Sequence, residues 1–439
     1  MNAVSNSLST DDCWSETPAE AFSMLPLTTL QRRLRAQLIK RLAELRECTL
    51  MLEDADGLET LGDGHSQLDT ALCCRLRVVN PDFYLAVSLQ GSVGAGESYM
   101  DGHWQCDDVV ALIRILVRNR DLLDAMETQG VARIGTWALT LWHSLRRNTL
   151  RGSRRNIAAH YDLGNALFGL FLDANMMYSS ALFVAPDESL ETASTRKLDR
   201  ICQKLDLQPG EHIIEIGTGW GGFAIHAARH YGVRVTTTTL SKEQRDLALQ
   251  RIADAGLSDR VEVLLSDYRD LQGSYDKLVS IEMIEAIGHQ YLDTYFAKVR
   301  SLLKPAGMAL IQAITIEDHR YEQAVRSVDF IKRFIFPGSF IPAIAPMQVA
   351  ISRSTDLKLF HLEDMGSSYA LTLRHWRQRF LARLPQVAGL GYPARFVRMW
   401  EFYLCYCEGG FEERSISVVQ MLLTAPRCRR PSFLPDLHA

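Results

Sequence analysis

The second half of the chain alternates short apolar runs with longer amphipathic runs. Apolar runs bounded by turn residues are typical of buried strands, and apolar positions at helical spacing are typical of helices. The pattern predicts strands at 213–216, 233–239, 261–265, 277–281 and 308–316, and helices at 220–231, 242–255 and 290–303. This alternation indicates the α/β class, with a doubly wound, mainly parallel sheet and helices on both faces. Ligands of such sheets bind at the carboxyl ends of the strands.

The first part of the chain predicts a smaller α+β domain. Leucines at helical spacing, separated by arginines, predict a basic amphipathic helix over residues 30–47. This helix would either cap the domain or lie on a membrane surface. Strands are expected at 49–53 and 72–79, followed by a glycine-rich turn region around 92–102 and a helix at 108–119.

Composition adds a domain plan and a cellular setting. With 439 residues and 47% hydrophobic content, the chain is long enough for two cores. We expect a disordered tail (1–25), an N-terminal accessory domain (26–145), a basic linker (146–159) and a catalytic domain (160–439). Nine cysteines without a C-x-x-C pair predict a reducing compartment and no metal site. Because the sequence shows neither signal-peptide features nor a long apolar run, we expect a cytoplasmic protein.

The predicted linker is strongly basic. It contains five arginines with no acidic residue between them, namely Arg146, Arg147, Arg151, Arg154 and Arg155. One interpretation is a solvated charge run, and the other is a docking patch for the headgroups of an anionic bilayer. We expect no nucleic-acid partner, because no nucleic-acid-binding motif accompanies these arginines.

The segment 214–222 reads IEIGTGWGG and fits the pattern G-x-G-x-x-G. A dinucleotide site of this type has an acidic residue at the end of the second strand, where this chain has four threonines. The acidic residue here is Glu215, inside the first strand. That position suits S-adenosylmethionine, because a carboxylate offsets its ammonium and sulfonium charges and glycines let it approach the backbone. We therefore predict a methyl-donor site formed by Glu215, Gly217, Gly219 and Gly221.

Segments after the second and third strands extend this predicted site. The run TLSKEQ from Thr239 opens a helix as a capping box, and Gln244 or Thr239 would also contact the ribose of the donor. Leu240 lies between them and is assigned to the same site. Asp267 and Tyr268 follow the third strand, where an acid and an aromatic ring would bracket the adenine.

Several longer motifs occur in order along the chain. They are HYDLGN from His160, MYSS from Met177, the glycine loop, TLSKEQ, SIEMIEAIGHQYLDTYF from Ser280 and FIKRFIFPGSFIP from Phe330. With these motifs, residues 82–426 resemble the cyclopropane fatty acid synthases, including the mycolic acid cyclopropane synthases. The run SVGAGESYMDGHW from Ser92 also looks like the accessory domain of the longer bacterial members.

The resemblance implies a methyltransferase that depends on S-adenosylmethionine. Family members transfer the methyl group to a cis double bond of a phospholipid acyl chain, then close a ring by losing a proton to a bound bicarbonate. An unsaturated membrane phospholipid, peripheral binding on the inner face of the membrane and a homodimer are implied with it. The resemblance also assigns Tyr178 and Ser179 to the donor site. The aromatic segment 330–342 would line an acyl groove or form ordinary core.

An anion site is carried over with the motifs. Glu285 matches the glutamate that holds bicarbonate, Tyr369 matches a tyrosine of the same pocket, and Ile314 contributes a backbone group. Cys407 matches a cysteine once regarded as a nucleophile. Because the chemistry needs no covalent enzyme intermediate, we expect Cys407 to line the pocket.

Two positions depart from the family and leave the reaction product open. Ser180 replaces a cysteine but keeps a backbone N–H, and Gln312 replaces a histidine and cannot titrate. If that histidine is essential, the product would be a methyl or methylene branch instead of a ring. Two different functions are also compatible with the donor site: methyl transfer to nitrogen or oxygen of a small molecule, and lipid binding without catalysis. Retention of Glu285, Tyr369 and the glycine loop argues against the inactive lipid-binding module.

Overall fold

The computed structural model describes residues 24–64, 72–122 and 163–431. The chain forms two compact units. The first comprises Met1–Leu139 together with Pro393–Glu413, and the second comprises Thr140–Tyr392 together with Arg414–Ala439. The predicted linker, and with it the boundary near residue 145, lies outside the described residues.

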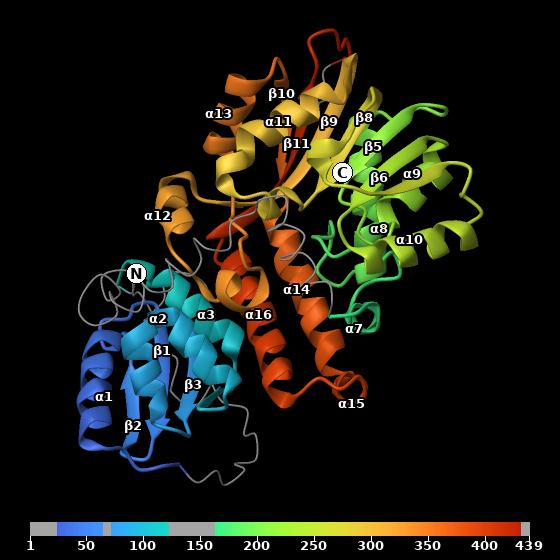
Figure 1. The fold of residues 1–439 in the computed structure, drawn as a ribbon. Coiled ribbons are helices and arrows are strands. Elements are labelled where there is room, and N and C mark those ends of the chain that lie inside the picture. Colours follow the sequence, from blue (N-terminus) through green and yellow to red (C-terminus); the bar gives the residue numbers. More distant parts are fainter. Residues whose placement is uncertain (1–23, 65–71, 123–162, 432–439) are drawn as a thin grey trace, which may run out of the picture. The chain divides into compact units, whose positions relative to one another are not determined.

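A seven-stranded sheet organises the second unit (Figure 1). The strands are β5 (His212–Ile216), β6 (Arg234–Thr239), β7 (Val261–Leu265), β8 (Tyr275–Ile281), β9 (Leu303–Ile316), β10 (Lys358–Asp364) and β11 (Ile416–Thr424). Their order is β10-β11-β9-β8-β5-β6-β7. The pairs β9/β8, β8/β5, β5/β6 and β6/β7 are parallel, whereas β11 pairs antiparallel with both β9 and β10. The predicted α/β class and mainly parallel sheet are thus confirmed.

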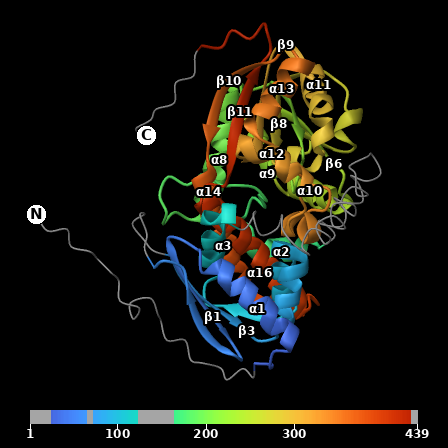
Figure 2. The same cartoon turned by 90° about the vertical axis from the view of Figure 1, so that its left-hand side faces the viewer.

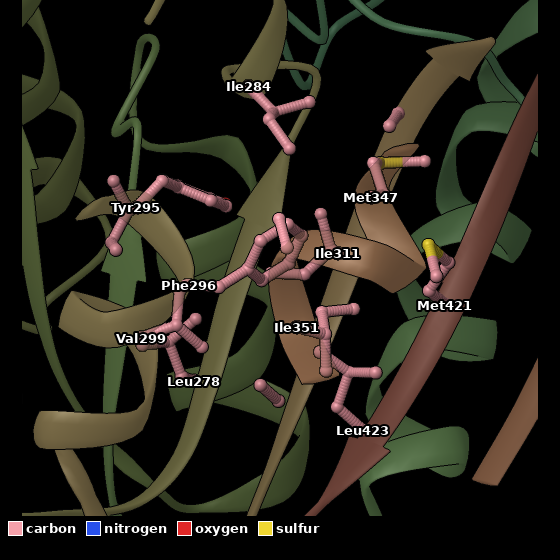
Figure 3. Packing of buried hydrophobic residues seen from close by; sticks show 14 of the residues in the cluster. Leu278, Ile284, Tyr295, Phe296, Val299, Ile311, Met347, Ile351, Met421 and Leu423 are labelled. Atoms are coloured by element: carbon pink, nitrogen blue, oxygen red, sulfur yellow. The ribbon is translucent and has the colours of Figure 1, made fainter. Parts of the chain in front are cut away.

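Helices cover both faces of this sheet. Successive residues of a strand point to opposite faces and therefore pack into two different cores. Ile213 packs with α8 (Leu190–Leu205), α9 (Gly222–Tyr231) and α10 (Lys242–Asp254). Ile214 faces the opposite core, which contains α11 (Leu292–Ser301) and α13 (Ile344–Ser354). Figure 3 shows part of the second core, where Phe296 and Val299 of α11 approach Leu278 and Ile311 from the strands. Buried on both sides, the sheet is a rigid base for residues at its strand ends.

Four further helices complete the second unit within the described residues. They are α7 (Asn165–Phe171), α12 (Tyr321–Arg326), α14 (Gly366–Leu381) and α15 (Leu384–Gly389). Of these, α14 packs against β11 and against α7. The antiparallel edge made by β10 and β11 is also visible in Figure 2.

The first unit is an α+β fold, as expected. Its sheet has the order β2-β1-β3-β4, with β1 (Cys48–Asp54), β2 (Gly57–Leu61), β3 (Leu72–Val78) and β4 (Trp104–Cys106). Its helices are α1 (Thr29–Leu42), α2 (Asp82–Met100), α3 (Val109–Arg118) and α16 (Ala394–Glu412). Every second residue of β1 and β3 is buried, so one face of the sheet carries the core. The grouping of α16 with this unit differs from the expected continuous catalytic domain.

One predicted element was wrong. The glycine-rich region expected as a turn around 92–102 belongs to α2, which runs to Met100. Its bend is at Gly91, whose φ of 56° is left-handed. A side chain at Gly94 would meet the backbone oxygen of Ala86 at 2.1 Å, so this glycine permits close packing across the bend. Among the described residues, no helix has the length and apolar character needed to span a membrane.

Candidate active site

The predicted glycine loop connects β5 to α9, at the carboxyl end of β5. Gly217, Gly219 and Gly221 have φ values of 105°, 51° and 84°, which favour glycine. The N–H groups of Gly217 and Thr218 donate to the carbonyl of Thr238, so β6 holds the loop. A Cβ added at Gly219 would meet no protein atom within 4 Å. The loop therefore leaves space for a ligand against its backbone, which fits S-adenosylmethionine.

Glu215 lies under this loop and is almost fully buried, with 2% of its surface exposed. Its Oε2 accepts a hydrogen bond of 2.7 Å from the hydroxyl of Thr237. Burial raises the pKa of Glu215 to about 8, and the charge of Lys197 opposes that rise. The carboxyl group is thus placed at the strand end as predicted, beside a buried cation.

That cation was not predicted. Lys197 on α8 has no exposed surface, and its ammonium donates to the hydroxyl of Ser179 at 2.8 Å. Burial lowers its pKa to about 8, while the charges of Glu282, Asp173 and Glu215 oppose the decrease. In the sequence, Lys197 is one polar residue of an amphipathic helix, so only the tertiary fold reveals its role. It joins the predicted donor site to a cluster of carboxylates.

The residues expected to contact the ribose and the adenine differ in the partners that the structure gives them. Ser241 caps α10 by accepting from the backbone N–H of Gln244, as a capping box requires. The Gln244 side chain instead accepts from the hydroxyl of Thr239, at 2.9 Å. Asp267 is engaged by Arg269 at 2.7 Å. These polar side chains therefore have partners within the protein, and their contacts with the donor stay predictions.

Tyr268 belongs to the core under α11. Its ring contacts Tyr295 edge-on, with 5.6 Å between ring centroids. This packing explains the burial of Tyr268 without an adenine. Leu240 follows β6 immediately and lies between Thr239 and the cap of α10. The adenine contact of Tyr268 and the donor contact of Leu240 stay predictions.

Tyr178, the predicted donor residue of the MYSS motif, sits in an aromatic cluster. Its ring stacks on Trp376 at 5.3 Å and contacts Phe168 edge-on at 5.2 Å. Phe336, from the aromatic segment 330–342, lies 6.4 Å away. Other members of that segment, such as Phe330, are core residues. Part of the segment therefore forms ordinary core. Phe336 instead lies beside Tyr178 at the candidate site.

Glu282 is the centre of the predicted anion site and was missed by sequence reasoning. Its Oε1 accepts from the backbone N–H of Ser180 at 2.9 Å and from Nε2 of Gln312 at 2.8 Å. Its Oε2 accepts from the hydroxyl of Tyr369 at 2.7 Å. Glu282 directly follows β8, at the sheet edge where ligands bind. That position was the signal that could have identified it.

Glu285 lies one turn further along the chain. Its Oε1 accepts from the backbone N–H of Ile314 at 2.6 Å. Its Oε2 is buried and has no hydrogen-bond partner in the protein. The structure therefore brings together Glu285, Ile314, Tyr369, Gln312 and Ser180, but Ile314 donates to Glu285, and the other three donate to Glu282.

The two carboxyl groups differ in what stabilises their charge. Burial raises the pKa of Glu282, while its three hydrogen-bond donors and Lys197 oppose the rise. Burial and repulsion by Glu282 raise the pKa of Glu285 to about 8, with only backbone hydrogen bonds opposing them. Paired carboxyl groups in unlike environments divide into an anion and a neutral acid. Glu282 is placed to be the anion of this pair.

A row of buried polar side chains fixes the orientation of Gln312. The Lys204 ammonium, which has only donors, bonds Oε1 of Gln420 at 2.7 Å. Nε2 of Gln420 must then face Oε1 of Gln312, at 3.0 Å. Gln312 is left with Nε2 toward Glu282. The row begins at Glu363, which pairs with Lys204, and it secures a donor where the family has a histidine.

Cys407 is the remaining residue of the predicted catalytic set. It lies on α16 in the first unit, half-buried. Its assignment as a pocket-lining residue stays a prediction. The motif residues from His160 to Asp162 lie outside the described residues.

The raised pKa of Glu285 makes a prediction about stability. Between pH 4.5 and about 8, folded Glu285 keeps a proton that the unfolded chain has released, so the free energy of unfolding falls as pH rises. Glutamine at position 285 cannot titrate. The fall in the free energy of unfolding between these pH values should therefore be smaller in Glu285→Gln than in the wild type, by roughly 1–3 kcal/mol. The part due to Glu215 should remain in the variant. Urea denaturation at several pH values, with the exposed Glu322→Gln as control, measures the difference. If the free energy of unfolding changed equally with pH in the wild type and in both variants, the burial of Glu285 would be contradicted.

Comparison with known proteins agrees with this geometry. The family model "Mycolic acid cyclopropane synthetase" matches residues 148–421. The tuberculostearic acid methyltransferase UfaA1 of Mycobacterium tuberculosis is 39% identical over 77% of this chain and 80% of its own length. The cyclopropane-fatty-acyl-phospholipid synthase of Escherichia coli is 38% identical over 80% of this chain and 87% of its own length.

A solved structure of the same family is also similar to this chain. The mycolic acid cyclopropane synthase CmaA1, complexed with SAH and CTAB, has a TM-score of 0.58 and 30% identity. The match covers 62% of this chain and 98% of that one. The range matched by the family model includes the glycine loop and the carboxylate cluster. The chain belongs to the mycolic acid cyclopropane synthetase family and is an S-adenosylmethionine-dependent methyltransferase.

Proposed function

We propose that the protein methylates the double bond of an unsaturated acyl chain in a membrane phospholipid. The observation that carries the proposal is the half-buried carboxylate of Glu282, which holds three hydrogen bonds just after β8, in the same sheet as the glycine loop. S-adenosylmethionine, when bound, supplies an electrophilic methyl group. A weakly nucleophilic alkene needs positioning, charge stabilisation and a proton acceptor, and the site offers residues for each.

The chain's own residues divide these tasks. Gly219 leaves room for the donor, and Glu215 lies beside it with a carboxyl group. The partly exposed Tyr178 stacks on the buried ring of Trp376, and an aromatic ring at this place can stabilise positive charge. Glu282 is half-buried and so retains accessible surface, as a group that receives a proton must.

The names of the relatives support a lipid substrate and leave the product open. One is a tuberculostearic acid methyltransferase, and another is a cyclopropane-fatty-acyl-phospholipid synthase. We retain the ring as the proposed product, because the matching family model and the solved structure described above are those of cyclopropane synthases. A methyl or methylene branch is the second candidate product.

Phospholipids from cells with and without the protein should differ by one CH2 unit on unsaturated chains. Unchanged lipid masses with methylation of a soluble amine instead would contradict the proposal.

The proposal extends to peripheral binding at the inner face of the membrane, through the arginine linker. Each arginine near an anionic surface adds up to ~1 kcal/mol of attraction. Arg151→Gln with Arg154→Gln should thus lower affinity for anionic vesicles by up to about 30-fold at low salt. Activity on detergent-dispersed lipid should stay unchanged.

Arg427→Gln with Arg429→Gln, a pair of exposed arginines elsewhere, is the control for vesicle sedimentation. Equal binding by both double variants would leave the linker a solvated charge run. The homodimer stays a prediction.

A further inference from the structure

The bicarbonate that the family resemblance implies does not fit the donors of this chain. Ser180, Gln312 and Tyr369 are three of the positions that would hold it, and all three donate to Glu282. A carboxylate and a bicarbonate are both planar anions with acceptor oxygens, so one set of donors serves only one of them at a time. The carboxylate of Glu282, which is part of the protein itself, therefore occupies the place where bicarbonate would bind.

We infer that Glu282 is the proton acceptor of the reaction and that this chain works without bicarbonate. The inference rests on the proposed function. It adds a catalytic residue and removes a cofactor.

The donors around Glu282 come from separate parts of the fold. Ser180 precedes α8, Gln312 lies on β9, and Tyr369 lies on α14. Gln312 cannot turn its oxygen toward Glu282, because Gln420 and Lys204 fix its orientation. All three groups therefore present N–H or O–H to one carboxylate. A chance contact would not engage three elements and a buried row of side chains.

The backbone at Glu282 supports a functional role. Its φ is 47°, in the left-handed region where glycine is favoured and most side chains are strained. Strained conformations of this kind persist where the surrounding structure holds them, and they concentrate at active sites. A glycine would relieve the strain and would leave an open anion site. This chain instead places a carboxylate there.

Charges around Glu282 favour its ionised form relative to its neighbour. Lys197 lies on the donor side of the cluster and opposes the burial that raises the pKa of Glu282. Glu285, repelled by Glu282, has its pKa raised to about 8 and so keeps its proton at neutral pH. Of the two carboxyl groups, Glu282 is the one whose three donors and neighbouring cation oppose the rise in pKa that burial causes.

The proton transfer balances without a further reactant. After methylation, the acyl chain carries a positive carbon next to the methylated one. A C–H bond of the new methyl group breaks, and its electron pair forms the third bond of the ring. The proton moves to a carboxylate oxygen of Glu282, which becomes a neutral acid and returns the proton to solvent before the next turnover. No oxidant, reductant or second anion takes part.

The first test uses the wild type alone. Turnover on unsaturated vesicles in carbon dioxide-free buffer should equal turnover with added bicarbonate, to within about two-fold. Stimulation by bicarbonate of more than about ten-fold would overturn the inference. Absence of methylated lipid under both conditions would count against the proposed function instead. Binding of carbon-13-labelled bicarbonate, followed by NMR line broadening, then decides the inference independently of activity. The wild type should not bind it.

The second test vacates the position. Glu282→Gly suits the left-handed backbone and frees Ser180, Gln312 and Tyr369 to hold bicarbonate. Turnover should fall at least about 10²-fold in carbon dioxide-free buffer and recover in part as bicarbonate is added. The variant should also bind labelled bicarbonate in the NMR experiment.

The matched control is Glu47→Gly, because Glu47 is also left-handed, with φ of 60°, and lies in the first unit. It should keep wild-type turnover and gain no bicarbonate binding. Full activity of Glu282→Gly without bicarbonate would show that Glu282 is not the acceptor. If Glu282→Gly fails to fold, the isosteric Glu282→Gln should still lose turnover, and its full activity would equally overturn the inference.

Discussion

Lys197→Met is expected to lower the free energy of unfolding by about 3–5 kcal/mol, the usual effect of leaving a buried charge without its partner. Lys197 is fully buried, and its charge faces the carboxyl groups of Glu215, Glu282 and Asp173. Methionine fills a similar volume but compensates none of them. The loss should shrink at acidic pH, because Glu282, whose pKa is raised by burial, then takes up a proton. Urea denaturation at neutral and acidic pH measures both effects.

Lys204→Met is the matched control for this prediction. Lys204 lies on the same helix, is equally buried, and has its pKa lowered by burial to about 8. Its carboxylate partner Glu363 also pairs with Arg200, at 2.7 Å, so it keeps one cation in the variant. We therefore expect a smaller loss, of about 1–3 kcal/mol, mainly from the unpaired Gln420. Equal losses for the two variants would contradict the clustering of carboxylates around Lys197.

Gly219→Val is expected to weaken binding of S-adenosylmethionine by at least about 100-fold, or about 2.7 kcal/mol. The position is open toward the ligand, since a Cβ there meets no protein atom within 4 Å. A branched side chain would occupy that space, and its left-handed backbone would add strain of roughly 1–2 kcal/mol. Titration calorimetry on folded protein measures the affinity.

Gly210→Val separates the two effects. Gly210 precedes β5, has a φ of 87°, and also meets no protein atom within 4 Å. The same strain arises there, away from the glycine loop. We expect Gly210→Val to keep wild-type affinity for the donor. Equal loss of affinity in both variants would mean that Gly219 acts through stability alone, and tight NADH binding by the wild type would favour a dinucleotide site.

Local pattern was enough to predict the parallel part of the sheet in the second unit. Apolar runs and the glycine loop located β5 to β9 and the helices between them, because each of these elements carries its own periodicity. The region around Gly91 failed for a physical reason. Glycines there permit a bend and close packing inside a helix, and a sequence cannot distinguish that use from a turn.

The donors of the predicted anion site meet at an acceptor that the sequence did not indicate. Ser180, Gln312 and Tyr369 converge as expected, and the backbone N–H of Ser180 is the group used. What they hold depends on Glu282, whose side chain had no assigned role in the resemblance. Lys197 was missed because its partners are distant in sequence and meet only when the sheet and α8 pack. Such long-range pairing leaves no local signal.

The proposed reaction is tested most directly with purified protein, methyl-deuterated S-adenosylmethionine and vesicles of an unsaturated phospholipid. Mass spectrometry of the acyl chains should detect one added carbon that carries two of the three deuterium atoms, with no carbon–carbon double bond left at or beside the site of addition. This result requires methyl transfer to the alkene and removal of a hydrogen from the transferred group, as ring closure demands. A chain that retains all three deuterium atoms and a double bond would establish a methyl branch. Unlabelled acyl chains, with donor bound and the protein folded, would contradict the account.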